Sequence, residues 1–299
     1  MQRSLIFHFL RWSMGFSALL VLGCIATLVF FLLSKGWPAW NTQLFFGNTN
    51  PLDAILGRAP LWEGIWSAFM GTLCLIAATM ALVLLPGIGC GIFLAEYASP
   101  AWNKRLSTAI DLLAGAPSIV MGLFGFTLIL FLRRTFLPEA NTCLLLAAGC
   151  LSLLVTPVLV VNTREALEAV PRSIKLAASS LGFSKNQIVF RVALPMAVGG
   201  IVSGAILAMG RSAEDTAVIM LTGAVANAGL PSSLLAKFEA LPFTIYYTMA
   251  HYQTQEELNL AFGAALLLLL LATVMVILAK GLELGHQYFW QGEVPSVLQ

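Results

Sequence analysis

Four polar residues interrupt an apolar stretch in the last third of the chain: Arg211, Glu214, Asp215 and Thr216. A charged side chain in the middle of a bilayer costs about 2.5–3.5 kcal/mol even on a lenient insertion scale, so its presence needs a reason. On a helix, Arg211 reaches Glu214 at i+3 and Asp215 at i+4, which allows a structural ion pair. The alternative is a position along a translocation path where an anion binds in passing, because the planar guanidinium binds oxyanions through two parallel hydrogen bonds.

A second candidate is Ser118, in the segment GAPSIV. Its hydroxyl lies beside a proline, and the backbone of a proline-broken membrane helix can face a cavity. Ser118 is therefore either a polar group on the same path as Arg211 or a packing residue at a kink. We assign the nearby Gly115, Gly122 and Gly125 to close helix packing.

Other kinds of chemistry lack the residues that they need. His8, His251 and His286 have no metal-ligand spacing, and the five cysteines show neither CxxC nor Cys/His spacing. The sequence contains no GxxxxGK(S/T) loop for the phosphates of ATP and no acid/base cluster. We therefore expect no metal, no cofactor and no enzymatic activity. The net charge of +2 is too small to indicate nucleic-acid binding.

Membrane helices must position these polar residues. The chain is 59% hydrophobic and 10% charged, with a mean hydropathy of +0.88, whereas soluble domains are about 25% charged. This composition predicts an all-α polytopic membrane protein, in which about 20 apolar residues make each crossing. The six predicted spans are 14–33, 65–94, 112–132, 142–161, 192–221 and 258–279.

The basic residues set the expected orientation. With a cytoplasmic N-terminus, most of the 16 Lys and Arg residues fall on the cytoplasmic side, as the positive-inside rule requires. Arg133 and Arg134, at the outer end of the third span, are exceptions. We expect a multi-pass protein with both termini in the cytoplasm, and a longest cytoplasmic loop at 164–191.

This loop contains a short amphipathic segment. Ile174, Ala177, Ala178 and Leu181 recur at i, i+3, i+4 and i+7 and form one apolar stripe. Gly182 suits the C′ position that closes a helix. Such a helix either lies in the lipid headgroup layer or docks in a groove on another protein. The stripe has few large apolar groups, which favours docking.

The same loop carries a pattern of fixed spacing. Leu176-Ala177-Ala178 is followed three residues later by Gly182, and nine residues after that by Val192-Ala193-Leu194-Pro195. This resembles the signature of ABC importer permease subunits, EAA, three residues, Gly, nine residues, then I-x-L-P. Leu176 replaces the glutamate, and Val192 replaces the isoleucine. The resemblance implies a coupling helix that docks on a separate ATPase, through Arg172, Lys175, Leu176, Ala177, Ala178, Leu181, Gly182, Leu194 and Pro195.

Further segments resemble the phosphate-specific branch of these permeases, and its A-type member in particular. They include LLAGAPSIVMGLFG, EALEAVPRSIKLAASSLG and LPFTIYY, within a resemblance that covers roughly 64–279. The resemblance implies six transmembrane helices in the type I importer (MetI-like) fold, in the inner membrane of a prokaryote. The implied partners are a second permease subunit in a heterodimer, an ABC ATPase dimer, an extracytoplasmic phosphate-binding protein and membrane lipid.

The charged segment matches this branch in part. The branch pattern R-A-x-G-E-T-A aligns with 211–217, so that Asp215 takes the place of the acid and Glu214 replaces a glycine. The resemblance implies a path for inorganic phosphate along Arg211, Glu214, Asp215, Thr216 and Ser118. Another oxyanion, such as sulfate, molybdate or tungstate, is an alternative substrate. A stand-alone secondary transporter is a further alternative, in which the coupling motif would have no role.

We expect three parts along the chain. An N-terminal transmembrane helix and an extracytoplasmic loop occupy 1–63. The permease core occupies 64–282, with its coupling loop at 164–195, and a cytoplasmic tail follows at 283–299.

Overall fold

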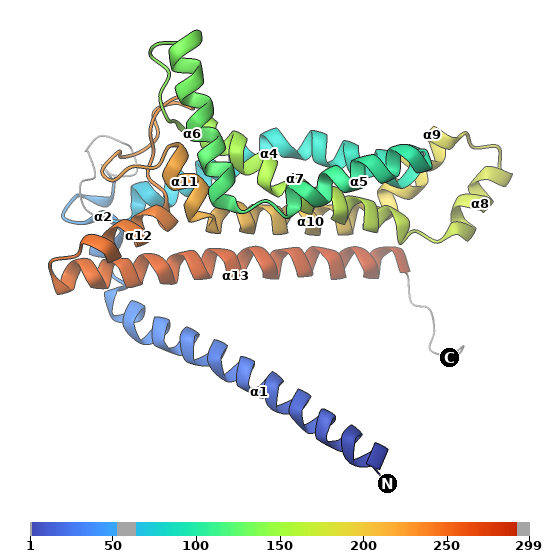
Figure 1. Cartoon of the computed structure of the whole chain (residues 1–299), viewed down its shortest axis with the longest axis horizontal. Coiled ribbons are helices and arrows are strands. Elements are labelled where there is room, and N and C mark those ends of the chain that lie inside the picture. The colour runs from blue at the N-terminus through green and yellow to red at the C-terminus, as the bar shows by residue number, and fades with distance from the viewer. Residues whose placement is uncertain (1, 53–63, 292–299) are drawn as a thin grey trace.

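The computed structural model describes residues 2–52 and 64–291, whose secondary structure is helical apart from one isolated bridge between Ala224 and Phe238 (Figure 1). Six helical segments are long and apolar enough to cross a membrane: Arg11–Ala39, Trp66–Tyr97, Ser118–Thr135, Leu144–Glu168, Lys185–Glu214 and Gln255–Gly285. The predicted all-α class with six membrane helices is confirmed. The loop residues 53–63 and the end of the predicted tail, 292–299, lie outside the described residues.

The long helices are α1 (Gln2–Gly36), α4 (Trp66–Ile92), α6 (Ser118–Thr135), α7 (Leu144–Glu168), α10 (Leu194–Glu214) and α13 (Gln255–Gln291). The short helices are α2 (Thr42–Phe46), α5 (Pro100–Ala114), α8 (Arg172–Ser180), α9 (Lys185–Ile188), α11 (Thr216–Thr222) and α12 (Leu241–His251). Two π-helical turns continue α4 and α9, namely η2 (Phe93–Tyr97) and η3 (Val189–Ala193). Because α13 runs to Gln291, the first part of the predicted tail is helical.

A central bundle of α4, α7, α10 and α13 forms the body of the protein (Figure 1). Glycines bring its helices close together. A Cβ atom added to Gly87 of α4 would lie 2.7 Å from Leu159 of α7, and one added to Gly204 of α10 would lie 2.5 Å from Asn162. Lipid gives no hydrophobic drive for helices to associate, so this close van der Waals packing stabilises the bundle.

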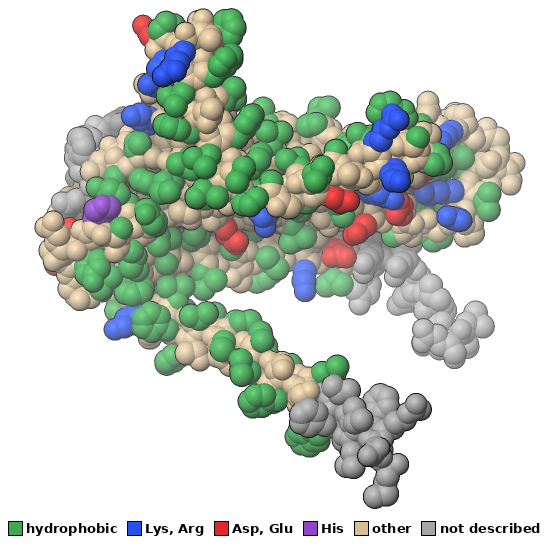
Figure 2. Space-filling view, in the orientation of Figure 1, with side chains coloured by type: hydrophobic (Ala, Val, Ile, Leu, Met, Phe, Trp, Pro, Cys, Tyr) green, Lys and Arg blue, Asp and Glu red, His purple; other side chains and the backbone are tan. Residues whose placement is uncertain are grey.

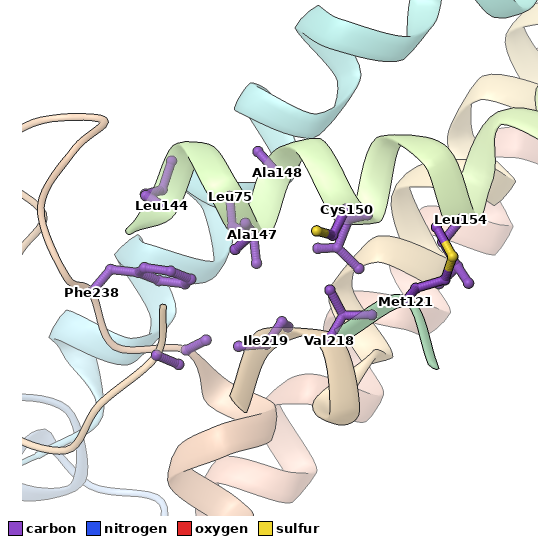
Figure 3. Packing of buried hydrophobic residues seen from close by; sticks show 13 residues of the cluster. Leu75, Met121, Leu144, Ala147, Ala148, Cys150, Leu154, Val218, Ile219 and Phe238 are labelled. Atoms are coloured by element: carbon purple, nitrogen blue, oxygen red, sulfur yellow. The ribbon is translucent and has the colours of Figure 1, made fainter. Parts of the chain in front are cut away.

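A buried apolar cluster joins four helices to the loop 223–240 (Figure 3). It contains Leu75 of α4, Met121 of α6, Leu154 of α7, Val218 of α11 and Phe238 of the loop. Backbone N–H groups at the start of α7 donate to carbonyl groups of the same loop at 2.8 and 3.0 Å. The loop thus supplies partners for donors that a helix N-terminus leaves unsatisfied.

The third predicted span, 112–132, is not one helix. α5 ends at Ala114, α6 begins at Ser118, and Pro117 between them has an extended backbone (φ −60°, ψ 138°). Proline has no N–H group to donate and disfavours helical backbone at the residue before it, so the helix stops there. Within this region only α6 is a membrane span.

The fifth predicted span, 192–221, is also broken. α10 ends at Glu214, Asp215 leaves the helical conformation (φ −76°, ψ 105°), and α11 begins at Thr216. The Asp215 Oδ1 atom accepts a hydrogen bond of 2.8 Å from the N–H of Val218. Aspartate competes for backbone donors in this way, which favours it at helix caps over helix interiors. At the other end, helical backbone begins at Lys185, earlier than predicted.

The predicted coupling loop is shorter than expected. α7 continues to Glu168, where Arg164 forms an i,i+4 ion pair with Glu168 at 2.7 Å. The Arg164 guanidinium also donates to the Ser107 hydroxyl of α5 at 3.2 Å. These interactions extend the helix beyond its apolar part, so residues 169–171 alone connect α7 to α8.

α1 and α6 diverge from the bundle (Figure 1). The apolar window of α1 is 0% buried, and α1 meets α13 near Gly36, where an added Cβ would lie 2.9 Å from the Phe262 carbonyl oxygen. The start of α1 and the last described turn of α13 lie at the end of the bundle that carries α8. Both described ends of the chain therefore share one side with the amphipathic segment.

Candidate functional site

Arg211 and Glu214 lie on an uncovered face of α10 at the depth of the apolar core. Both are exposed, whereas Ser212 and Ala213 between them are 0% exposed. Ala213 belongs to a buried cluster that packs against Leu268, in the apolar middle of α13. The two charges therefore sit at membrane depth on a surface that this chain does not cover itself.

Arg211 has no carboxylate within 4.0 Å among the residues that the structure describes; the ion pairs there join Arg164 to Glu168 and Lys175 to Glu96. The Asp215 carboxylate instead accepts the Val218 N–H at the start of α11. Of the two predicted alternatives, the internal ion pair is not formed in this part of the chain. The guanidinium can therefore meet an anion or a neighbouring subunit.

Ser118 and Thr216 are the first residues of two neighbouring helices, α6 and α11, and both are half-buried. α6 packs on α11 at Gly122, where an added Cβ would lie 3.0 Å from the Ala217 carbonyl oxygen. Further along α6, Gly125 lies against Thr222, which is a later residue of α11. The two helices therefore run in the same direction. The structure thus brings Ser118 and Thr216 to one level, beside the end of α10.

The three glycines assigned to packing have two different roles. Gly122 and Gly125 are packing residues, since a Cβ added to Gly125 would lie 2.4 Å from the Cys150 sulfur of α7. Gly115 is not, because an added Cβ would meet only carbonyl groups of α5, at 3.5 Å and beyond. Gly115 instead follows the last residue of α5 and ends that helix.

The break between α10 and α11 opens onto a cavity. Thr216 lines this cavity of about 590 Å³ together with Pro242, Tyr246 and Met249 of α12. In a membrane protein, non-helical backbone is tolerated where it lines a cavity or is buried in protein. Thr216 therefore borders a shallow, open depression beside α12, next to the end of the span.

The amphipathic segment forms the helix α8, and Gly182 closes it as predicted. Gly182 has a φ of +83°, its N–H donates to the Ser179 carbonyl at 3.0 Å, and the N–H of Phe183 donates to the Ala178 carbonyl at 3.2 Å. These two bonds are the Schellman pattern, which requires a left-handed residue at C′. The glycine therefore fixes where α8 ends.

The outer surface of α8 differs from the predicted docking surface. Leu176 and Leu181 are 67% and 78% exposed, and Arg172, Ala177 and Gly182 are also exposed. Ala178 is only 7% exposed. Its small side chain faces the rest of this chain, and its part in docking stays a prediction.

Lys175 is turned toward the bundle. Its Nζ donates to Glu96 Oε1 of η2 at 2.5 Å and to the Leu167 carbonyl of α7 at 3.2 Å. The two charged side chains are 22% and 14% exposed. Lys175, predicted for docking, therefore anchors α8 to the ends of two membrane helices. Glu96 was missed in the sequence, where its only signal is an acid directly after an apolar span.

Leu194 and Pro195 form the start of α10, and neither is exposed. Leu194 packs against a buried cluster that contains Leu167 and Val170 at the end of α7. The pair lies inside the continuous helical segment Lys185–Glu214, so the return toward the membrane begins before it. The apolar side chain of Leu194 packs within this chain.

Tyr97 joins α9, which follows α8, to the end of α4. Its hydroxyl donates to Asn186 Oδ1 of α9 at 2.8 Å. Since Tyr97 and Glu96 are neighbours in η2, this single π-helical turn holds both α8 and α9. π-Helical turns within α-helices often mark functional positions.

A buried carboxylate holds the opposite end of the bundle. Glu239, 7% exposed, accepts hydrogen bonds from the Ser67 hydroxyl at 2.5 Å and from the Gly229 N–H at 2.9 Å. Burial raises the pKa of this carboxyl, and the hydrogen bonds from Ser67 and the loop backbone offset part of the rise. The spacing of 172 residues between Glu239 and Ser67 explains why no sequence pattern revealed it.

Comparison with known proteins places these features in a family. The family model described as "Binding-protein-dependent transport system inner membrane component" matches residues 87–285. The chain is 31% identical over 255 residues to the phosphate transport system permease protein PstA of Yersinia pestis, covering 85% of this chain and 81% of the relative. It is 29% identical over 265 residues to PstA of Haemophilus influenzae, with 88% and 89% covered.

Two solved structures share the fold. The MetNI methionine ABC transporter in an inward-facing conformation gives a TM-score of 0.53 at 18% identity, covering 78% of this chain and 99% of that chain. A bacterial alginate ABC transporter, in complex with an alginate pentasaccharide-bound periplasmic protein, gives a TM-score of 0.57 at 15% identity, covering 88% and 93%. The type I importer (MetI-like) fold predicted from the sequence is confirmed.

The family match covers α8, Arg211 and the break after α10 in one continuous region. Its description and the names of the relatives are those of transport components, so this chain is a transport subunit and not an enzyme. The chain belongs to the family of binding-protein-dependent transport system inner membrane components, in the group of the PstA-type permeases of ABC importers.

Proposed function

We propose that this chain is the A-type permease subunit of an ATP-driven importer and forms one wall of a path for inorganic phosphate. The PstA names of its relatives support this substrate. The single observation that carries the proposal is Arg211, an exposed guanidinium at membrane depth with no carboxylate within 4.0 Å in the described chain. Its planar fork matches two oxygens of a phosphate ion.

The uncovered face of α10 supports a second permease subunit, as a heterodimer. Arg211 and Glu214 would be costly against lipid, where intramembrane charges are rare and face a bundle interior or a water-filled cavity. A second subunit would complete such an interior around the two charges. Phosphate would then pass between the subunits at the level where α10 ends.

The acidic residues beside Arg211 favour the passage of phosphate over its tight binding at this position. A fixed cationic site would hold phosphate, whereas conduction needs binding weak enough to release the ion. Glu214 and Asp215 make the local charge negative and would weaken the hold of Arg211 on the anion. Ser118 and Thr216 would add hydroxyl groups at the same level.

The exposed side of α8 would dock on an ABC ATPase dimer in the cytoplasm, and an extracytoplasmic binding protein would deliver phosphate at the opposite end. With α8 in the cytoplasm, both termini are cytoplasmic as well. Motion of α8 would reach α4 through Lys175 and Glu96, and α7 through the Leu167 carbonyl. Rigid-body movement of this kind switches a transporter between outward and inward access.

In this assignment the permease core is 64–282 with its coupling loop at 164–195. Residues 1–63 add the outer helix and an extracytoplasmic loop, and 283–299 form the cytoplasmic end.

The test is uptake of radiolabelled phosphate by the transporter purified through this chain and reconstituted with ATP inside. Arg211→Ala should abolish most uptake while co-purification of the ATPase is unchanged, and Arg211→Lys should restore it in part. Lys280→Ala, which removes an exposed positive charge of α13 away from this face, is the matched control and should retain uptake. Full uptake by Arg211→Ala would remove Arg211 from the path. Stronger competition by sulfate, molybdate or tungstate than by unlabelled phosphate would overturn the substrate.

A further inference from the structure

An apolar groove runs along the outer face of α4 toward α8 and α9. It has a volume of about 590 Å³ and is lined by Leu85, Ile88, Gly89 and Phe93, with Phe190 of η3 on its other side. Leu85 is 84% exposed and Phe190 is 56% exposed. The groove lies on a membrane span, so an apolar chain, and not water, is the ligand that suits it.

Gly89 leaves room for such a chain. A Cβ atom added to Gly89 would meet nothing within 4 Å, whereas Gly87 and Gly91 on the same helix are in tight contact with α7. Gly87 and Gly91 are therefore explained by helix packing within this chain. Helix packing does not explain Gly89. Because glycine has no side chain, the groove stays open at this position.

The groove ends at a cation. Tyr97 lines its last part, and the Nζ of Lys185 lies 5.0 Å from the centroid of the Tyr97 ring. Lys185 is exposed and has no carboxylate within 4.0 Å among the described residues. Figure 2 shows further Lys and Arg side chains at this end of the bundle, together with Asp and Glu side chains. An apolar channel that ends at an uncompensated ammonium group is complementary to a lipid with an anionic headgroup.

We propose that this groove binds an anionic diacyl phospholipid of the leaflet on the side of α8. One acyl chain lies along Leu85, Gly89 and Phe93, and the headgroup phosphate pairs with Lys185. Juxtamembrane Lys and Arg residues attract anionic lipids in this manner. The proposal depends on membrane insertion and not on the identity of the transported ion.

The position of this site links it to the coupling segment. Tyr97 lies beside Lys185 and donates to Asn186 of α9, while the adjacent Glu96 holds Lys175 of α8. A lipid bound here would contact the one π-helical turn that joins α4 to both parts of the coupling segment. The lipid would therefore stabilise α9 against α4 at the base of α8.

Photo-crosslinking of lipids tests the proposal. The transporter purified through this chain is reconstituted with phosphatidylglycerol that carries a diazirine in one acyl chain, or with the matching phosphatidylcholine. Phosphatidylglycerol should label residues 81–97 and the region of Phe190 several-fold more than phosphatidylcholine does. Gly89→Trp fills the groove and should remove most of this labelling, and Lys185→Gln should make the two lipids equal. Gly23→Trp on α1, where an added Cβ also meets nothing within 4 Å, is the control and should leave the labelling unchanged.

Three results would overturn the proposal. Equal labelling by both lipids in the unmodified chain would show that the groove does not select an anionic headgroup. Unchanged labelling in Gly89→Trp would show that the acyl chain lies elsewhere. No labelling of 81–97 by either lipid in the assembled transporter would show that a neighbouring helix covers the groove. Phosphate uptake enters none of these readouts, so failure of this proposal and failure of the proposed function are separate results.

Discussion

Lys175 of α8 and Glu96 of η2 form a 2.5 Å ion pair across 79 residues of sequence. Both side chains are mostly buried, and the lysine also donates to the carbonyl of Leu167. The pair fixes the short helix α8 to the ends of two membrane helices. Without it, α8 would lose the ionic part of its attachment to the bundle.

Removing the lysine should separate ATPase binding from transport. A hydrogen bond to a charged group is worth about 1.5–3 kcal/mol, so Lys175→Met should loosen α8 and leave Glu96 without its partner. We expect ATPase hydrolysis that no longer drives uptake, measured as the ratio of substrate transported to ATP hydrolysed. The charge reversal Lys175→Glu with Glu96→Lys should recover part of the coupling. If the double variant is no better than either single change, the pair has another role.

The exposed leucines of α8 should control ATPase docking. Leu181 is 78% exposed, and Leu181→Asp places a charge on this surface, so co-purification of the ATPase should fall sharply. Leu176→Glu restores the residue of the ABC permease signature and should be tolerated. Ser173→Asp, an exposed change on the same helix, controls for added negative charge alone. Normal ATPase recovery with Leu181→Asp would place the docking surface elsewhere.

Gly182 should tolerate only residues that adopt a left-handed backbone. Its φ is +83°, and an added Cβ would meet nothing within 4 Å, so conformation and not space is limiting. Valine there should cost about 1–2 kcal/mol and fray α8, whereas asparagine should cost less. Coupled uptake should therefore decline in the order glycine, asparagine, valine. A large side chain such as Gly182→Trp should uncouple transport, and normal coupling in that variant would contradict docking through this part of α8.

Glu239 should make stability depend on pH at the end of the bundle opposite α8. Burial raises the pKa of Glu239 in the folded protein above its ordinary value of 4.5. Folding then favours the protonated form, so this residue's contribution to stability is greatest below the ordinary pKa and is lost as the pH rises through the raised pKa. Glu239→Gln imitates the protonated carboxyl and should remove this dependence.

The measurement is thermal unfolding in detergent, from a pH below the ordinary pKa of Glu239 to a pH above its raised pKa. The midpoint of Glu239→Gln relative to the unmodified chain should increase as the pH rises through the raised pKa. Ser67→Ala removes a hydrogen bond that lowers the pKa, so the transition should move to higher pH. A difference between Glu239→Gln and the unmodified chain that is constant with pH would exclude Glu239 as the titrating group.

Local patterns in the sequence predicted much of the architecture. Runs of apolar residues identified six spans because each crossing must be apolar over a length set by the bilayer. The period of Ile174, Ala177 and Leu181 identified α8, and Gly182 identified its end, because helix periodicity and the left-handed conformation of glycine are local properties. The break at Pro117 also has a local cause in the proline itself, although the apolar run concealed it.

The sequence by itself therefore determined the class of the protein, the number of its spans, the amphipathic helix α8 and the presence of charges at membrane depth. The tertiary structure decided which of these residues face outward and which face inward. It turned Lys175 and Ala178 toward the bundle, left Arg211 without an ion-pair partner in the described chain, and buried Glu239 beside Ser67. These outcomes depend on contacts between residues far apart in the chain. Composition, spacing and periodicity report only on near neighbours, so they carry no information about such contacts.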